Sequence, residues 1–236
     1  MLRTKNILSL SFSGLLLAGM TLAANAVTIT QGPSTVTGPT DFSGSLFFAK
    51  FNPSLGTLDS VFLTLRTSLT TTLTVTNNST DPSSGNAKTE LQAALYDPSA
   101  TVTTTGNVLT LTGGTFKVQD DVLTTPVSYS LAGGSTTVLN PPTKNAGTGA
   151  VNITSPGSIA FFSGAGTASV NYKTFTTTVL SNTGGNTSAS QSTTDGLSAT
   201  LIYNYTPFTP EPGTWAILAA GASTGLVAIR RRHNKK

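Results

Sequence analysis

The chain has 236 residues, a formal net charge of +4, no cysteine and one histidine, His233, which lies in a basic C-terminal tail. These counts exclude disulfides, thiol catalysis and cysteine metal sites, and they exclude a histidine-based catalytic triad upstream of the tail. The positive charge belongs to the two ends, because residues 27–208 hold six basic and eight acidic side chains, a net charge of −2. That balance excludes a basic surface for nucleic acid.

Residues 1–26 have the order of parts of a secretory signal peptide. Arg3 and Lys5 supply a positive start, a mostly apolar run follows, and Ala24 and Ala26 give a small-x-small pattern at its end. The apolar run is short for a retained anchor, and polar sequence follows it at once. We therefore expect export, with signal peptidase cutting after Ala26.

The middle of the chain, residues 27–208, is rich in threonine and alternates apolar with polar side chains. Leu69, Leu73 and Val75 alternate with threonines, and the run over 197–205 alternates in the same way. Successive side chains of a strand point to opposite faces, so one set faces a core and the other faces water. A disordered polar linker, the competing interpretation, lacks such β-branched and aromatic residues. We predict an all-β domain, an antiparallel β-sandwich or jelly roll.

Glycine pairs separate several of the predicted strands. Gly113-Gly114 and Gly133-Gly134 each lie between two alternating runs, and such a connection suits the positive φ angles of a tight turn. We therefore predict a β-hairpin at each pair. Residues 89–95 fit either a short helix, because their leucines are four apart, or a strand.

The candidate chemistry of this domain rests on a few carboxylates. They are Asp41, Asp59, Asp81, Glu90, Asp97, Asp120, Asp121 and Asp195. A glycosidase needs two carboxylates facing each other across a cleft, whereas several of these lie in turn contexts, namely Asp81-Pro82, Asp97-Pro98 and Asp195-Gly196. A glycoside hydrolase is therefore the least favoured function, and we predict no catalytic residue and no cofactor. The adjacent Asp120 and Asp121 are candidate Ca²⁺ ligands, with a solvated turn near a strand end as the alternative.

Aromatic residues offer a second kind of candidate site. Phe47-Phe48 and Phe161-Phe162 form pairs on predicted strands, so one member of each is expected in the core. Tyr172, Tyr203 and Tyr205 are the candidates for an exposed platform on which sugars stack. Simple packing in the core is the alternative for all three tyrosines.

Residues 209–236 combine a rigid motif, an apolar helix and a positive stop. Residues 215–229 are apolar, and 15 residues make a helix of about 22 Å, against about 30 Å for a bilayer core. The flanking residues are Pro210, Glu211 and Pro212 on one side and Arg230, Arg231 and Arg232 on the other. The arginines favour the cytoplasmic side, and the short span favours a temporary tether over a permanent anchor.

This order of parts resembles the PEP-CTERM sorting signal, the C-terminal address of exosortase substrates in Gram-negative bacteria. Thr209 and Gly213 stand where family members often have Val and Ser. The resemblance implies exosortase as a processing partner, with cleavage near the Pro-Glu-Pro motif. It also implies an inner-membrane intermediate that moves to the outer surface or to the extracellular matrix with its exopolysaccharide.

The middle of the chain resembles the choice-of-anchor E domain, through residues 51–58, 61–65 and 161–168. That family implies a surface domain without an assigned chemistry. We therefore expect a non-enzymatic structural or interaction role. A module that binds exopolysaccharide, assisted by calcium, is the alternative.

Overall fold

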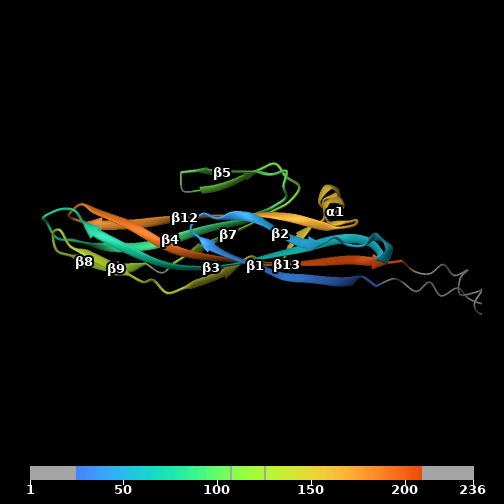
Figure 1. Ribbon diagram of the computed structural model, residues 1–236, viewed down its shortest axis with the longest axis horizontal. Coiled ribbons are helices and arrows are strands. Elements are labelled where there is room, and N and C mark those ends of the chain that lie inside the picture. Colours follow the sequence, from blue (N-terminus) through green and yellow to red (C-terminus); the bar gives the residue numbers. More distant parts are fainter. Residues whose placement is uncertain (1–24, 107, 125, 209–236) are drawn as a thin grey trace, which may run out of the picture. The chain divides into compact units, whose positions relative to one another are not determined.

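The structure, a computed structural model, describes residues 25–106, 108–124 and 126–208 (Figure 1). In this part of the chain every pairing between named strands is antiparallel. The prediction of an all-β, antiparallel fold is thus confirmed. Among the described residues, no helix has the length and apolar character needed to cross a membrane.

The strands form two main sheets, one of six strands and one of five. The first, sheet A, consists of β1 (Val27–Pro39), β13 (Thr187–Pro207), β3 (Gly56–Asn77), β9 (Thr136–Leu139), β10 (Lys144–Gly147) and β11 (Val151–Ile153). In it β13 lies between β1 and β3, and the three short strands pair with β3 at successive positions along its length.

The second sheet, sheet B, is built around two long strands in the same way. Its strands are β2 (Ser43–Ala49), β12 (Thr167–Thr183), β4 (Ser83–Tyr96), β7 (Lys117–Leu123) and β8 (Val127–Leu131). Here β12 lies between β2 and β4, while β7 and β8 pair with β4 at successive positions. Residues 89–95 belong to β4, so the strand interpretation of that stretch is the right one.

The core lies between the two sheets, as the alternation predicts. Leu63 of β3, Leu95 of β4, Val170 of β12 and Leu201 of β13 have no exposed surface and belong to one apolar cluster. Along β3, buried and less buried residues alternate almost from end to end, with threonines forming most of the outward set. Two antiparallel sheets with a shared core agree with a β-sandwich.

Both predicted hairpins at glycine pairs are wrong. Gly133-Gly134 connects β8 of sheet B to β9 of sheet A. Gly113-Gly114 connects β6 (Val108–Thr112), which pairs with β5 (Thr101–Thr105), to β7 of sheet B. Gly113 and Gly114 do have positive φ angles, 71° and 76°, but these turns lead from one sheet to another.

The β5–β6 hairpin covers part of the outer face of sheet B (Figure 1). Leu109 and Leu111 of β6 are buried against Ala94 of β4. Gln92 accepts a hydrogen bond from the backbone N–H of Leu109 at 2.6 Å, which fixes the hairpin to β4.

Two short helices connect strands. The 3₁₀ helix η1 (Pro53–Leu55) follows Asn52, and α1 (Pro156–Phe162) begins after Ser155, whose hydroxyl accepts from the N–H of Ser158 at 3.4 Å. The pair Phe161-Phe162 therefore lies on a helix and not on a strand. Phe162 is nevertheless fully buried, and at the other predicted pair Phe48 is 3 % exposed whereas Phe47 is 65 % exposed.

Candidate functional site

The three tyrosines considered as candidates for a sugar platform pack in the core or against it. Tyr203 has no exposed surface, and its hydroxyl donates a hydrogen bond to the carbonyl oxygen of Ala49 at 2.7 Å. Tyr172 is 8 % exposed, and Tyr205 packs on Phe51 with ring centroids 5.0 Å apart. The packing alternative holds, because the inward positions of β12 and β13 face aromatic neighbours across the sandwich.

Asp120 and Asp121 lie in the middle of β7, so the predicted solvated turn is wrong. The hydroxyl of Thr67 on β3 donates to Asp120 at 2.6 Å, which places the Asp120 carboxylate on the inner side of sheet B. Asp121 is exposed and pairs in register with Gln92. Although the residue is exposed, partial desolvation of its carboxylate chiefly raises the pKa of Asp121, with the charges of Asp120 and Glu90 adding to it. Adjacent residues of a strand point to opposite faces, so these two carboxylates do not form a paired Ca²⁺ site.

Most of the residues to which the sequence assigns a sorting or cleavage role lie outside the described residues. They are Ala24, Pro210, Glu211, Pro212, Arg230, Arg231 and Arg232. Ala26, at the predicted signal peptidase site, is described; it is exposed and directly precedes β1.

The outer face of sheet A is mostly polar and rich in hydroxyl groups, with Phe62, Val138 and Ile202 among its apolar members. We define the polar face as the outward residues along β3 with their neighbours on either side. It consists of Thr64, Arg66, Ser68, Thr70, Thr72, Thr74 and Thr76 of β3, Ser188, Ser190, Ser192, Thr194, Ser198 and Thr200 of β13, and Thr136, Asn140, Thr143 and Asn145.

Cross-strand hydrogen bonds order several of these side chains. The hydroxyl oxygens of Thr70 and Thr143 are 3.0 Å apart, and Thr72 donates to the side-chain oxygen of Asn140 at 3.1 Å. Threonine suits this position because its branched side chain fits the pleat while its hydroxyl stays hydrated. The face therefore presents donors and acceptors in rows set by the strand spacing.

Arg66 is the cation of the polar face. It is exposed, and it pairs in register with Ser198 on β13 and with Gly147 on β10. Gly147 has no side chain, and a Cβ built there would come within 3.3 Å of the Cγ atom of Arg66. Within the described part of the chain the one ion pair joins Lys88 and Glu90, so the guanidinium of Arg66 has no carboxylate partner there.

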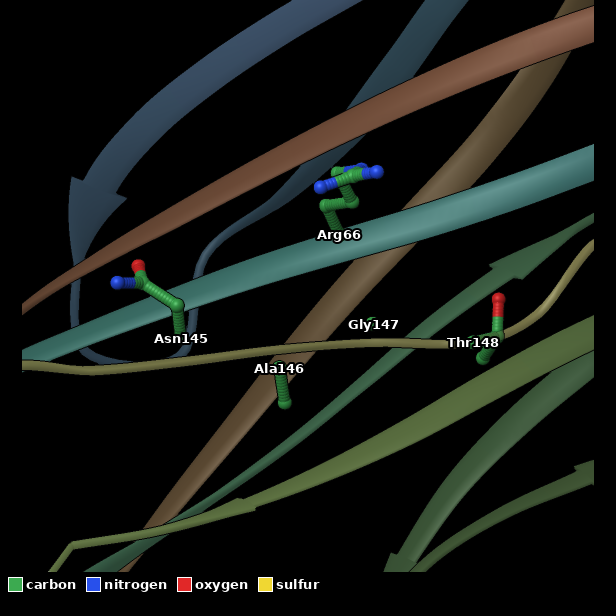
Figure 2. A pocket seen from close by; sticks show the side chains of 5 residues that line it. All are labelled: Arg66, Asn145, Ala146, Gly147 and Thr148. Atoms are coloured by element: carbon green, nitrogen blue, oxygen red, sulfur yellow. The ribbon is translucent and has the colours of Figure 1, made fainter.

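Two adjoining hollows of about 280 and 290 Å³ flank Arg66 and share Asn145 and Ala146 in their lining. Figure 2 shows the side chains of Arg66 and Asn145 on the same side of the sheet, with Ala146 pointing to the opposite side. The backbone of Thr148 donates to the carbonyl oxygen of Leu65 at 2.9 Å, and its hydroxyl accepts from the N–H of Leu65 at 3.1 Å. The edge of the hollow next to Arg66 is therefore fixed.

Arg66 and its surroundings suit a ligand with many oxygens. A guanidinium offers five N–H donors in a planar fork that matches carboxylates, while the hydroxyls and Asn145 both donate and accept. No carboxylate lines either hollow, so no negative charge of the lining residues repels an anionic ligand. This combination is suited to binding polar, oxygen-rich molecules, and the residues that line the hollows include no base beside a hydroxyl.

Arg66 was not identified from the sequence, although a signal for it exists. It is the one arginine between Arg3 and Arg230, and it occupies an outward position in the alternating run that continues into Leu69 and Leu73. The missing information was which strands lie beside β3. Asn145 and Ser198 are remote in sequence, and only the sheet order brings them to Arg66.

Comparisons with known proteins add little to this picture. No protein-family profile and no curated protein matches the chain. Among solved structures, the chain is similar to the infectious bursal disease virus Gx strain at 12% identity and a TM-score of 0.16, over 78% of this chain and 37% of that chain. A mutant VP2 protein of the same virus gives 12% identity and a TM-score of 0.14, over 93% of this chain and 53% of that chain. The chain thus spans about a third to a half of the length of these viral chains, and likenesses at such TM-scores carry no argument.

Proposed function

We propose that this chain is an exported surface or extracellular-matrix protein with a non-enzymatic interaction role. The order of a signal peptide over 1–26, a β domain and a PEP-CTERM-like tail over 209–236 supports export and processing by exosortase. The tail acts as a temporary inner-membrane tether while the β domain folds outside. Cleavage near Pro210, Glu211 and Pro212 then releases the domain toward the outer surface of a Gram-negative cell.

The interaction assigned to the β domain is binding of exopolysaccharide at the polar face. The observation that carries this assignment is Arg66, an exposed cation without a carboxylate partner among the described residues, set between hydroxyl rows. An acidic polysaccharide offers carboxylates to Arg66 and ring hydroxyls to the neighbouring Ser, Thr and Asn side chains. The tyrosine platform has no part in this proposal.

The binding test compares Arg66→Gln with Lys117→Gln, which removes the same charge from an exposed position on sheet B. The full chain in mild detergent is titrated with alginate, a polymer of uronic acids, and with neutral dextran. A charge-assisted hydrogen bond contributes about 1.5–3 kcal/mol, so Arg66→Gln is expected to weaken alginate binding about tenfold or more. Equal losses in both variants, or no alginate binding by the unmodified chain, would contradict the assignment.

The processing step has its own test. The surface form is isolated from cells that express exosortase, and its termini are read by mass spectrometry. We expect a start after Ala26 and an end near Pro212. A surface form that still contains Arg230, Arg231 and Arg232 would show permanent anchoring and overturn this part of the proposal.

A further inference from the structure

A second polar site lies between the two sheets, on the inner side of sheet A and away from the polar face. Asp195 of β13 has no exposed surface, whereas Asp41, in the connection between β1 and β2, is exposed at the mouth of this site. Both carboxylates bind one residue of β12, Thr176. Its N–H donates to Asp41 at 2.6 Å and its hydroxyl donates to Asp195 Oδ2 at 3.2 Å. Two acidic side chains from different elements therefore meet at one threonine.

The second carboxylate oxygen of Asp195 lacks a partner. Asp195 Oδ1 is out of reach of solvent and has no hydrogen bond in the described part of the chain. Neither Asp41 nor Asp195 has an ion-pair partner among the described residues. Burial, and then the charge of Asp41, raise the pKa of Asp195 to about 6, although interactions with the hydroxyls of Thr176 and Thr174 oppose this. A buried carboxylate oxygen without a partner is costly, so the site is chemically incomplete as it stands.

Several oxygen-bearing groups lie on the same elements as these carboxylates and Thr176, beside the apolar Leu69 that pairs in register with Asp195. The hydroxyls of Thr40 and Thr193 are hydrogen-bonded to each other, and Thr193 lies two residues before Asp195 on the same inward face of β13. On β12, the hydroxyl of Thr174 donates to the carbonyl oxygen of Phe42 at 3.2 Å. Carboxylate, hydroxyl and carbonyl oxygens are the ligands of hard cations, and Ca²⁺ accepts them in irregular geometry.

We propose that the Asp41–Asp195 site binds one Ca²⁺ ion. Asp195 Oδ1 and the Asp41 carboxylate supply two negative charges that balance the ion, and the threonine hydroxyls and the carbonyl of Phe42 complete its oxygen shell. The ion connects β13 of sheet A, β12 of sheet B and the segment that crosses between the sheets. It therefore stabilises the fold at this edge. The inference stands apart from polysaccharide binding, because Asp195 and Thr176 are buried between the sheets, whereas Arg66 is exposed on the polar face and forms an ion pair with neither carboxylate.

Calcium titration of the full chain in mild detergent tests the proposal. Calorimetry is expected to give one bound Ca²⁺, and saturating Ca²⁺ is expected to raise Tm by about 4 °C or more over EDTA. Mg²⁺ is expected to bind more weakly, because it demands octahedral geometry and retains water. Asp195→Asn and Asp41→Asn should both abolish the Ca²⁺ response, whereas Asp59→Asn, at an exposed carboxylate of β3, should keep it.

The readout separates ligation from folding. Asp195→Asn removes a buried charge and can raise Tm by itself, so the difference between Ca²⁺ and EDTA is what counts; Asp41→Asn provides the second variant. Calcium binding that survives both substitutions would overturn the proposal. The proposal would also be overturned if Ca²⁺ neither bound to the unmodified chain nor raised its Tm while acidification stabilised it, because protonation of Asp195 would then complete the site.

Discussion

Thr67 of β3 donates its hydroxyl hydrogen to Asp120 of β7 at 2.6 Å, across the space between the two sheets. Thr67 is 3 % exposed and lies in the row of inward-facing residues of β3, where its neighbours in the row, Leu65 and Leu69, have apolar side chains. A hydroxyl in such a row is explained by the carboxylate that it satisfies. The bond joins sheet A to sheet B by a polar contact beside the apolar core.

Thr67→Val keeps the β-branched shape of the side chain and removes the donor. Asp120 then loses its partner while still half-buried, and a hydrogen bond to a charged group contributes about 1.5–3 kcal/mol. We expect a loss of that size in the free energy of unfolding, measured as a lower urea midpoint with an unchanged m value. Thr70→Val, on the outer face, should change stability by about 0.5 kcal/mol or less. A similar loss in both variants would mean that the hydrogen bond adds nothing specific.

Asp97 holds the turn after β4 to the segment before β7. It is 3 % exposed; its Oδ1 accepts from the N–H of Ser99 at 2.7 Å, and its Oδ2 accepts from the N–H groups of Thr115 and Phe116. Burial acts to raise the pKa of Asp97, but the hydrogen bonds from Ser99 and Thr115 outweigh it and lower the pKa to about 2. The sequence-based interpretation of Asp97-Pro98 as a turn is confirmed, and its carboxylate also fixes a distant segment.

This lowered pKa predicts acid sensitivity. Because the folded pKa lies below the ordinary value of 3.8, the stabilisation is complete above about pH 4 and is lost as the pH falls toward about 2. Asp97→Asn should cost about 2 kcal/mol at pH 7 and much less at pH 2. Urea unfolding at both pH values measures the difference, with Asp59→Asn as the exposed control. A cost for Asp97→Asn that does not change with pH would refute this account.

The alternation of side chains predicted the layers of the fold well, because it depends only on the two-residue period of a strand. The inward set of β3 (Leu63, Leu65, Leu69, Leu73) is buried as expected.

The order of the strands in the two sheets could not be predicted from this alternation. A glycine pair permits a turn within one sheet or between two, so Gly133-Gly134, in which Gly134 has a positive φ of 70°, is consistent with both. Long-range pairing decides between them.

The candidate sites depend on those long-range pairings even more strongly. Asp195 was interpreted as a turn residue from Asp195-Gly196, yet it lies within β13 and meets Asp41 and Thr176. Arg66 acquires its setting from Ser198 and other residues that are remote in sequence. Residue type identified the available chemistry, but no local pattern indicates which polar side chains the two sheets bring together.

Tyr203 provides a test between packing and sugar stacking. Its ring lies against Phe51 and Phe162, and its hydroxyl donates to the carbonyl of Ala49 at 2.7 Å. Tyr203→Phe keeps the ring and removes one buried hydrogen bond, so we expect a loss of about 1 kcal/mol. Tyr203→Ala should cost about 3–5 kcal/mol by leaving a cavity. Denaturant unfolding measures both losses. Alginate binding by Tyr203→Phe should equal that of the unmodified chain, and a selective loss of binding would restore the platform hypothesis.

Gly85 of β4 is required by the close approach of β12. A Cβ at Gly85 would collide with the backbone carbonyl of Ser181, and its Cα partner in register is Asn182 on β12. The backbone of a paired strand cannot shift without breaking the hydrogen bonds to its neighbour, so Gly85→Ala forces β4 and β12 apart. We expect a loss of about 3 kcal/mol or more in the free energy of unfolding, as for severe overpacking, together with a broadened thermal transition.

Gly149→Ala is the matched control, because a Cβ there meets nothing within 4 Å and its φ is not positive. That variant should unfold within about 0.5 kcal/mol of the unmodified chain. If Gly85→Ala were equally neutral, the pairing of β4 with β12 at Asn182 would be wrong, and the placement of the β12–β13 connection would be wrong with it.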